Sequence, residues 1–408
     1  MSSRKVVIIG HGYTSRLAVI RSVAQIGCEV TVIVMTQYKK DGKTLRGKKP
    51  IDCYSKFVSH VFFCHARDED GLIHLLLEKC ADKQKKVVII PDSDFSAATI
   101  DKFQDRLTDY FLFPHIHHTP GAIAKWMEKP RQKVLAEEMG LNVSLGTVIH
   151  ITDGYYIIPE NIKFPCFTKP FITNIGGKQL FKKCDDERQL RHQLDYAATI
   201  CQNMSVLIED YKPIEKEYAV VGVSNGHDII IPGIIQIICM AHGGHYGVTC
   251  RGKVMPTDGF EDLISKFKNI VSTIGFVGLF DIDFYQSNGT YYFCELNLRF
   301  GGSGYAITKM GVNLPGMMVK FFYGENTKDM QKSISSEATF VNERMCQDDW
   351  YERYITFKEY RGMMSSSDVS FIKDNSDFKP YMKFLLCHIP LITKKSIKRF
   401  YKNGRLTH

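Results

Sequence analysis

The stretch of sequence that decides the fold is FCELNLRFGGSG, residues 293–304. Side chains of an extended strand alternate between the two faces of its sheet, so the polar residues Glu295, Asn297 and Arg299 would share one face. The other face would carry the apolar residues Cys294, Leu296, Leu298 and Phe300. The pattern therefore predicts a strand with one face in the core and one face in a site.

A second strand with acidic residues lies just upstream, at residues 277–285, and places Asp281 and Asp283 on one face. Residues 286–290 have the composition of a tight turn, and the resulting hairpin would bring Asp283 near Glu295. An ordinary edge hairpin with a solvated polar face is the alternative. The glycines in residues 301–304 favour a site, because glycine lets a backbone approach a ligand closely.

The polar face of residues 293–300 has the donor set of a magnesium nucleotide site. A carboxylate and an amide oxygen suit a hard divalent cation. A guanidinium at the next position on the same face, that of Arg299, suits a phosphate oxygen on the far side of that cation.

These residues resemble the ATP-grasp superfamily, and more narrowly its carboxylate-amine ligases of the D-aspartate ligase-like type. The resemblance implies that Asp283, Glu295 and Asn297 hold Mg²⁺, for which Mn²⁺ can substitute, and that Arg299 contacts the transferred phosphate of ATP. The proline that usually follows the asparagine is Leu298 here, which affects shape more than ligand chemistry.

The resemblance also implies an α/β fold in four parts. A Rossmann-like domain (residues 1–115) would precede the small lobe of the ATP-grasp fold (116–208) and the large lobe with the metal site (209–330). A C-terminal extension with a basic amphipathic tail (331–408) would follow, and residues 326–408 have no counterpart in the family pattern.

An upstream helix is expected to supply the first lysine of the nucleotide site. Residues 126–143 predict a short helix that ends at Gly140 and runs into a strand. By its distance to Gly140, Lys129 takes this role, with Lys133 as the alternative. Either could instead be a solvated helix lysine.

A second lysine, Lys169, is embedded in a short apolar strand, residues 164–170. Burying an unpaired lysine is costly, so it needs an anionic partner, and an ATP phosphate is a natural one. The following loop, with Gly176, Gly177 and Lys178, would fold over the phosphates as in the family. It is not a P-loop, because GxxxxGK[ST] is absent.

The segment 206–213 resembles the hinge between the two lobes. Glu209, Asp210 and Tyr211 would read the adenine edge, and Glu217 would bind the ribose hydroxyls. The family usually has a glycine before this second glutamate, where the chain has lysine, so a surface glutamate is the alternative for Glu217.

Residues 229–240 predict central strands, because Pro232 and Gly233 interrupt an apolar run that is too short to span a bilayer. His242 and His245 lack a third soft ligand at matching spacing, which favours a loop over a transition-metal site. Arg251 is expected late in a strand that faces the phosphates, where similar enzymes place an arginine for the acyl phosphate or the carboxylate substrate.

The first 115 residues begin with a strand, a glycine turn, a helix and a second strand, which is Rossmann-like. As a dinucleotide fingerprint the turn is weak, because Ser15 replaces the third glycine and no acid closes the second strand. A third strand, residues 86–91, ends at Asp92 and Asp94, which either help to bind substrate or cap the loop.

Composition and charge agree with a multidomain enzyme. A chain of 408 residues with 44% apolar residues can bury two or three cores. Twelve cysteines without a CxxC motif indicate reduced thiols. We find no pattern of a signal peptide or membrane span and expect a cytoplasmic protein.

The tail carries most of the net charge. Residues 379–408 contain eight Lys or Arg and no acid, so the remainder of a chain with formal charge +9 is near +1. Interleaved apolar residues suit contact with an anionic membrane surface. The alternative is that these apolar residues pack on the ligase core while the lysines stay solvated. No other part of the chain resembles a nucleic-acid module.

The resulting hypothesis is an ATP-dependent, ADP-forming ligase that activates a carboxylate as an acyl phosphate and joins it to an amine. Arg299, Lys169 and Arg251 would act in the chemical step, and the substrates would be an amino acid or an amino or uronic sugar precursor, in synthesis of a cell-envelope or polysaccharide precursor. Two alternatives stay open: a carboxyphosphate-forming enzyme of the carboxylase or carbamoyl-phosphate type, and a Rossmann NAD(P)-dependent oxidoreductase. The oligomeric state is open, with a homodimer as one option.

Overall fold

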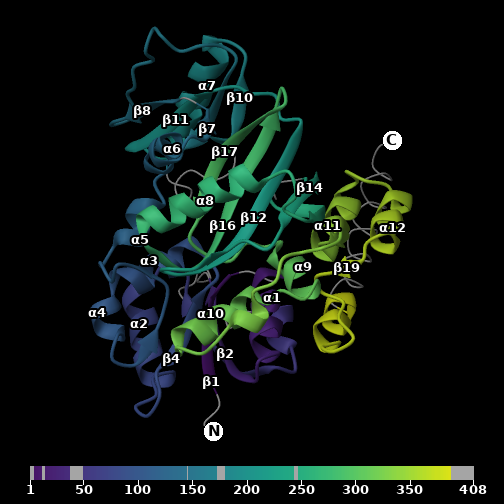
Figure 1. The fold of residues 1–408 in the computed structure, drawn as a ribbon. Coiled ribbons are helices and arrows are strands. Elements are labelled where there is room, and N and C mark those ends of the chain that lie inside the picture. Colours follow the sequence, from purple (N-terminus) through teal and green to yellow (C-terminus); the bar gives the residue numbers. More distant parts are fainter. Residues whose placement is uncertain are drawn as a thin grey trace, which may run out of the picture.

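A computed structural model describes residues 4–11, 14–36, 49–144, 146–171, 180–242 and 247–386 of the chain. Within these residues the strands form three sheets, which lie one above another in Figure 1. The N-terminal sheet lies at the bottom, the large sheet in the centre and the small sheet at the top.

The N-terminal sheet is parallel, with strand order β3-β2-β1-β4-β5, which confirms the predicted Rossmann-like domain. Its strands are β1 (Arg4–Gly10), β2 (Cys28–Thr36), β3 (Val58–His65), β4 (Val87–Pro91) and β5 (Phe111–Leu112). Its helices are α1 (Thr14–Ala24), η1 (Ile51–Tyr54), α2 (Glu69–Lys79), α3 (Asp94–Lys102) and α4 (Gln104–Leu107). The strand predicted as the third is the fourth, because β3 is largely half-buried and its apolar pattern is weak.

The small sheet is antiparallel and forms its own lobe. It contains β8 (Gly146–Ile151), β9 (Cys166–Pro170), β10 (Lys182–Cys184) and β11 (Met204–Asp210), in the order β10-β9-β11-β8. Helix α7 (Glu187–Ile200) covers one face with Leu190, Leu194 and Ala197, which share a core with β8, β9 and β11. The other face carries Lys169 and Glu209, on neighbouring strands.

The large sheet has the strand order β19-β18-β15-β14-β12-β16-β17-β7. These strands are β7 (Asn142–Val143), β12 (Lys216–Asn225), β14 (Ile234–Met240), β15 (Thr249–Met255), β16 (Phe276–Ser287), β17 (Thr290–Asn297), β18 (Ala338–Val341) and β19 (Val369–Ser370). Two short strands pair beside this path, β6 (His115–Ile116) with β16 and β13 (Ile229–Ile230) with β12. The predicted central strands at residues 229–240 are therefore confirmed.

Helices cover both faces of the large sheet. One face packs against α5 (Ala122–Trp126), α6 (Lys129–Glu138) and α8 (Glu261–Ile274). The opposite face packs against α1, α9 (Gly304–Lys309) and α10 (Leu314–Phe322), and this core continues into β1 and β2 of the N-terminal sheet. The N-terminal domain and the large lobe therefore share one core.

The C-terminal part of the chain is not a separate extension from residue 331 onward. Strands β18 and β19 extend the large sheet beyond β15, and η3 (Lys328–Met330), α11 (Glu343–Glu352) and α12 (Phe357–Ser365) belong to the same region. Phe384 is buried against Ile51 and Ile372, so the first residues of the basic tail pack on the N-terminal domain. In the part of the chain that the structure describes, no helix is both long and apolar enough to cross a membrane.

Candidate nucleotide site

The predicted acidic hairpin is present. Strands β16 and β17 pair antiparallel, with Asp283 opposite Glu295 and Asp281 opposite Asn297. The turn residues Asn288 and Gly289 have φ angles of 49° and 73°, a left-handed pair that matches a two-residue hairpin turn. The hairpin therefore places three carboxylates and an amide side by side on one face of the large sheet.

A β-bulge at Cys294 changes the predicted alternation. The register passes from Asp283–Glu295 directly to Phe284–Phe293, so Cys294 is the extra residue on its strand. Its thiol lies among site residues: burial raises its pKa, and the charges of Lys169 and Lys129 oppose that increase. The prediction that Cys294 belongs to the apolar face was wrong, because the bulge puts it on the same side as Glu295.

The end of the predicted strand also differs. Strand β17 stops at Asn297, and Arg299 and Phe300 lie in the loop before α9. Leu298 packs in the core beneath α8, whereas Phe300 packs in the core shared with α1. Strict alternation predicted that Leu298 and Phe300 share a face, and the structure shows that they do not.

Lys129 lies directly against the hairpin. Its Nζ is 2.5 Å from a carboxylate oxygen of Glu295. Burial disfavours the charged amine, but Glu295 more than offsets this and raises the pKa of Lys129. The side-chain amide of Gln132 holds the helix in place, because it accepts from the backbone N–H of Leu296 at 2.8 Å and donates to its carbonyl at 2.7 Å.

Glu209 binds two lysines in the interior between the lobes. Its carboxylate contacts Lys133 Nζ and lies 2.8 Å from Lys169 Nζ. Burial opposes ionisation of Glu209, but the two cations hold its pKa below the ordinary value. The Lys169 side chain is 13% exposed, and burial opposes its charge, but nearby Cys294 and Glu209 raise its pKa. Glu209 was predicted at the adenine edge, whereas its side chain here neutralises the lysines.

The carboxylates of the hairpin are suited to a divalent cation. Burial, followed by the charges of Asp281 and Glu295, raises the pKa of Asp283 well above its ordinary value. Asn297 Nδ2 donates to Asp283 at 3.3 Å, and one carboxylate oxygen of Asp281 is buried without a hydrogen-bond partner. A divalent cation would relieve this crowding of acids.

The described residues contain no group of three or more His, Cys, Asp or Glu side chains arranged to hold a metal ion. The predicted set has two carboxylates and an amide. It fits Mg²⁺, which typically uses one or two carboxylates and takes its other oxygens from phosphate and water.

Arg299 connects the hairpin to the N-terminal domain. Its Nε lies 2.7 Å from Asp94, in the first turn of α3, and its Nη2 lies 3.4 Å from Asn297 Oδ1. Burial opposes the charge, but Asp94 and Asp281 raise the pKa of the guanidinium. From the sequence, Asp94 had two possible roles, loop capping or substrate binding. In the structure its carboxylate forms an ion pair with Arg299.

The predicted hinge connects the small sheet to the large sheet, since β11 ends at Asp210 and β12 begins at Lys216. Tyr211 N donates to Pro165 O at 3.1 Å, which closes the start of the hinge. Glu217 lies opposite Tyr285, on the same face as Asp283, and burial raises its pKa. The adenine and ribose roles remain predictions, and Gly176, Gly177 and Lys178 lie outside the described residues.

Arg251 is not part of this group. Gly252, the next residue, pairs with Ile237, and Ile237 pairs with Glu217. Gly252 therefore lies on the same face of the sheet as Glu217, which is the face of the site. Arg251 therefore points to the opposite face, where its Nη2 donates to Ser366 at 3.0 Å. The expectation that Arg251 lies late in its strand and faces the phosphates was wrong, because β15 begins at Thr249 and its pairing with β14 turns Arg251 to the other face.

Comparison with known proteins identifies the fold. Residues 128–329 match the family described as "Carbamoyl-phosphate synthase L chain, ATP binding domain". The carbamoyl phosphate synthase large chain of Gemmatimonas aurantiaca is 23% identical over 215 residues, which cover 52% of this chain. The match spans only 20% of that relative's length.

Two solved structures have similar folds over most of their length. An L-amino acid ligase from Bacillus licheniformis has a TM-score of 0.60 at 15% identity, with coverage of 83% of this chain and 79% of that one. The biotin carboxylase domain of Hydrogenobacter thermophilus 2-oxoglutarate carboxylase, solved with MgADP and bicarbonate, has a TM-score of 0.62 at 17% identity, with coverage of 82% and 73%. The hairpin and the lysines thus lie in residues that match this ATP-binding domain family, and the fold over most of the chain is similar to that of ATP-grasp ligases.

Proposed function

We propose that this protein is an ATP-dependent, ADP-forming ligase that activates a carboxylate as an acyl phosphate and joins it to an amine. The observation that carries the proposal is the convergence of Lys129, Lys169 and Arg299 with the acidic pair Asp283 and Glu295 between the two lobes. Each of these cations has an acidic partner in the structure. An anionic nucleotide could exchange places with those partners.

The chemistry requires positioning and charge neutralisation more than a nucleophilic side chain. A substrate carboxylate oxygen would attack the γ-phosphorus of ATP as the bond to ADP breaks. The amine would then attack the acyl carbon, lose a proton and release phosphate. Lys129 and Lys169 would bind the phosphates of ATP, and Arg299 would contact the γ-phosphoryl group that is transferred.

Asp283, Glu295 and Asn297 would hold Mg²⁺, which supplies neutralisation of phosphate charge when bound. Glu295 would then exchange its contact with Lys129 for the cation, and the released Lys129 amine would be free to donate to a phosphate oxygen.

A second candidate function is formation of carboxyphosphate from bicarbonate. It is favoured by the match to carbamoyl phosphate synthase large chains, and it would use the same nucleotide residues. The two functions differ in the compound that accepts the phosphate.

A product assay separates the candidates. We expect ADP release from Mg-ATP to depend on an amino acid or uronic sugar together with an amine, and mass spectrometry to detect an amide of the two. Release that depends on bicarbonate, with ¹⁴C-bicarbonate incorporated into an acid-stable product, would instead establish the second function and contradict the first.

We also propose that the basic tail contacts an anionic membrane surface, because residues 379–408 combine eight cations with interleaved apolar side chains. Met382, Leu385 and Leu386 are exposed, although Phe384 is buried. Full-length protein should sediment with phosphatidylserine-containing liposomes, and protein truncated after residue 386 should not. Equal sedimentation of the two would eliminate the membrane contact.

A further inference from the structure

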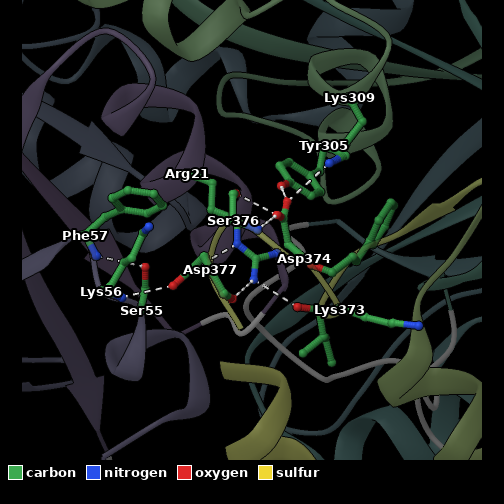
Figure 2. Close-up of polar contacts among 12 residues, drawn as sticks. Arg21, Ser55, Lys56, Phe57, Tyr305, Lys309, Lys373, Asp374, Ser376 and Asp377 are labelled. Atoms are coloured by element: carbon green, nitrogen blue, oxygen red, sulfur yellow. Dashed lines mark hydrogen bonds and ion pairs between the residues drawn. The ribbon is translucent and has the colours of Figure 1, made fainter. Parts of the chain in front are cut away.

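A segment beyond the family match, residues 371–377, is inserted between the N-terminal domain and α9 (Figure 2). Arg21 of α1 is only 2% exposed, and its guanidinium donates to this segment. It reaches the carboxylate of Asp377 at 3.0 Å and the carbonyls of Phe371, Ile372 and Asp377 at 2.9, 2.9 and 3.0 Å. A fully buried arginine with four such bonds fixes the segment on α1.

The segment is also fixed from the other side. Glu343, at the start of α11, is fully buried, and its carboxylate accepts from the backbone N–H groups of Phe371, Ile372 and Lys373 at 2.8 to 3.1 Å. The carboxylate of Asp377 further accepts from the backbone N–H of Lys56 at 3.0 Å. Residues 371–377 are thus held by contacts to three different regions of the chain.

Asp374, within residues 371–377, connects the segment to α9. Tyr305 of α9 donates its hydroxyl to Asp374 at 2.5 Å, and Lys309 Nζ lies 3.3 Å from the same oxygen (Figure 2). Tyr305 is buried, with its ring beneath the guanidinium of Arg21 and edge-on to Phe371. The first turn of α9 therefore cannot shift without breaking these contacts.

The loop that carries Arg299 ends where α9 begins. Residues 298–303 connect β17 to α9, and the ring of Phe300 lies where a side chain on Gly304 would stand, 2.3 Å from an added Cβ. Tight packing of Phe300 on the helix start means that the position of α9 sets the position of this loop. At its other end the loop is held by the contacts of Arg299 to Asp94 and Asn297.

We infer that residues 371–377 position Arg299: the Tyr305–Asp374 hydrogen bond fixes α9, and α9 fixes the loop that presents the guanidinium to the transferred phosphate. Tyr305 and Asp374 are positioning residues and touch no substrate. The catalytic consequence rests on the proposed function, whereas the mechanical link from residue 374 to the loop does not.

Tyr305→Phe tests the link by removing only the hydroxyl, and Asp374→Ala removes the acceptor, with Asp374→Asn as the conservative rescue. The matched control is Glu325→Gln, which weakens an ion pair elsewhere, between Arg4 of β1 in the N-terminal domain and Glu325, at 2.5 Å. Hydrogen exchange of the backbone amides of residues 298–309 is measured together with kcat and the KM for ATP.

We expect Tyr305→Phe and Asp374→Ala to speed exchange at residues 298–309 only, and to lower kcat by roughly tenfold, with the KM for ATP within about twofold of wild type. Asp374→Asn should lie between Asp374→Ala and wild type, and Glu325→Gln should match wild type in residues 298–309. A general loss of stability would speed exchange throughout the chain and would contradict a specific positioning role.

Unchanged exchange at residues 298–309 in both Tyr305→Phe and Asp374→Ala would overturn the inference, as would an equal effect of Glu325→Gln. The exchange measurement needs no turnover. If the wild type releases no ADP, the proposed function fails while the exchange result still decides the link between residue 374 and the loop.

Discussion

Glu295→Ala is expected to lower substrate-dependent ADP release by about 100- to 1000-fold, because it removes a proposed ligand of the Mg²⁺ that would neutralise the phosphate charge. Glu295 is also the partner of Lys129, so the variant leaves that amine without its contact at 2.5 Å. The first loss acts on the transferred phosphate, whereas the second leaves Lys129, which is 6% exposed, without its partner and also lowers stability. The measurement is coupled ADP release at saturating ATP.

The matched control for this variant is Glu337→Ala, because Glu337 also pairs with a lysine, Lys253, at 2.9 Å, but lies exposed away from the hairpin. It should retain wild-type activity. Glu295→Gln keeps the shape of the side chain and should be nearly as inactive as Glu295→Ala. Wild-type ADP release by Glu295→Ala would exclude the hairpin as the metal site.

Glu209→Ala is expected to destabilise the protein by about 3–5 kcal/mol, because it leaves Lys133 and Lys169 buried without their shared carboxylate. The side chains of Lys133 and Lys169 are only 10% and 13% exposed, so water replaces the lost partner poorly. The midpoints of thermal and urea unfolding measure this effect. Glu337→Ala, which breaks an exposed pair, should change stability by less than about 1 kcal/mol.

The pH dependence of this effect has a defined sign. Burial raises the pKa of Glu209, but the charges of the two lysines lower it more, so the folded-state pKa lies below the ordinary value. The stabilisation that Glu209 provides is therefore fully present above the pKa of an unfolded glutamate, about 4.3. It is lost as the pH falls through the lower, folded-state value. The stability difference between wild type and Glu209→Ala should therefore shrink on acidification below about pH 4, and a difference that grows there would contradict the ion pairs.

The acidic hairpin could be predicted from the sequence because its signals are local. Alternating polarity and the turn residues between the two segments predict that the strands pair through one polar face, whereas the exact pairing of Asp283 with Glu295 also needs the bulge. The bulge at Cys294 could not be predicted, since one extra residue in a strand leaves no mark in the sequence. Its effect is large, because it reverses the side to which every later residue of the strand points.

The partners of the cations depend on contacts between distant segments. Lys133 meets Glu209 from 76 positions away, and Arg299 meets Asp94 across 205 positions. No spacing rule connects such residues, so the sequence indicated that Lys169 needs an anion but did not identify Glu209 as that anion. The wrong orientation of Arg251 has the same origin, because its face is set by pairing through β14 and β12.

The C-terminal region shows a further limit of sequence patterns. Strand β18 has four residues, and its place in the large sheet depends on β15 as a partner. The segment 371–377 has no periodic pattern at all, yet Arg21 and Glu343 fix it through its backbone. Recognition through backbone groups is independent of the recognised side chains, and such contacts are therefore invisible in the sequence.

Isothermal titration of the full chain with ATP, in the presence of Mg²⁺ and again after its removal with EDTA, tests most directly that the hairpin and the lysines form a Mg-nucleotide site. We predict binding of one nucleotide per chain that weakens when Mg²⁺ is removed and weakens again in Lys169→Ala. Absence of ATP binding with and without Mg²⁺, or binding of NAD(P)H in its place, would contradict the assignment.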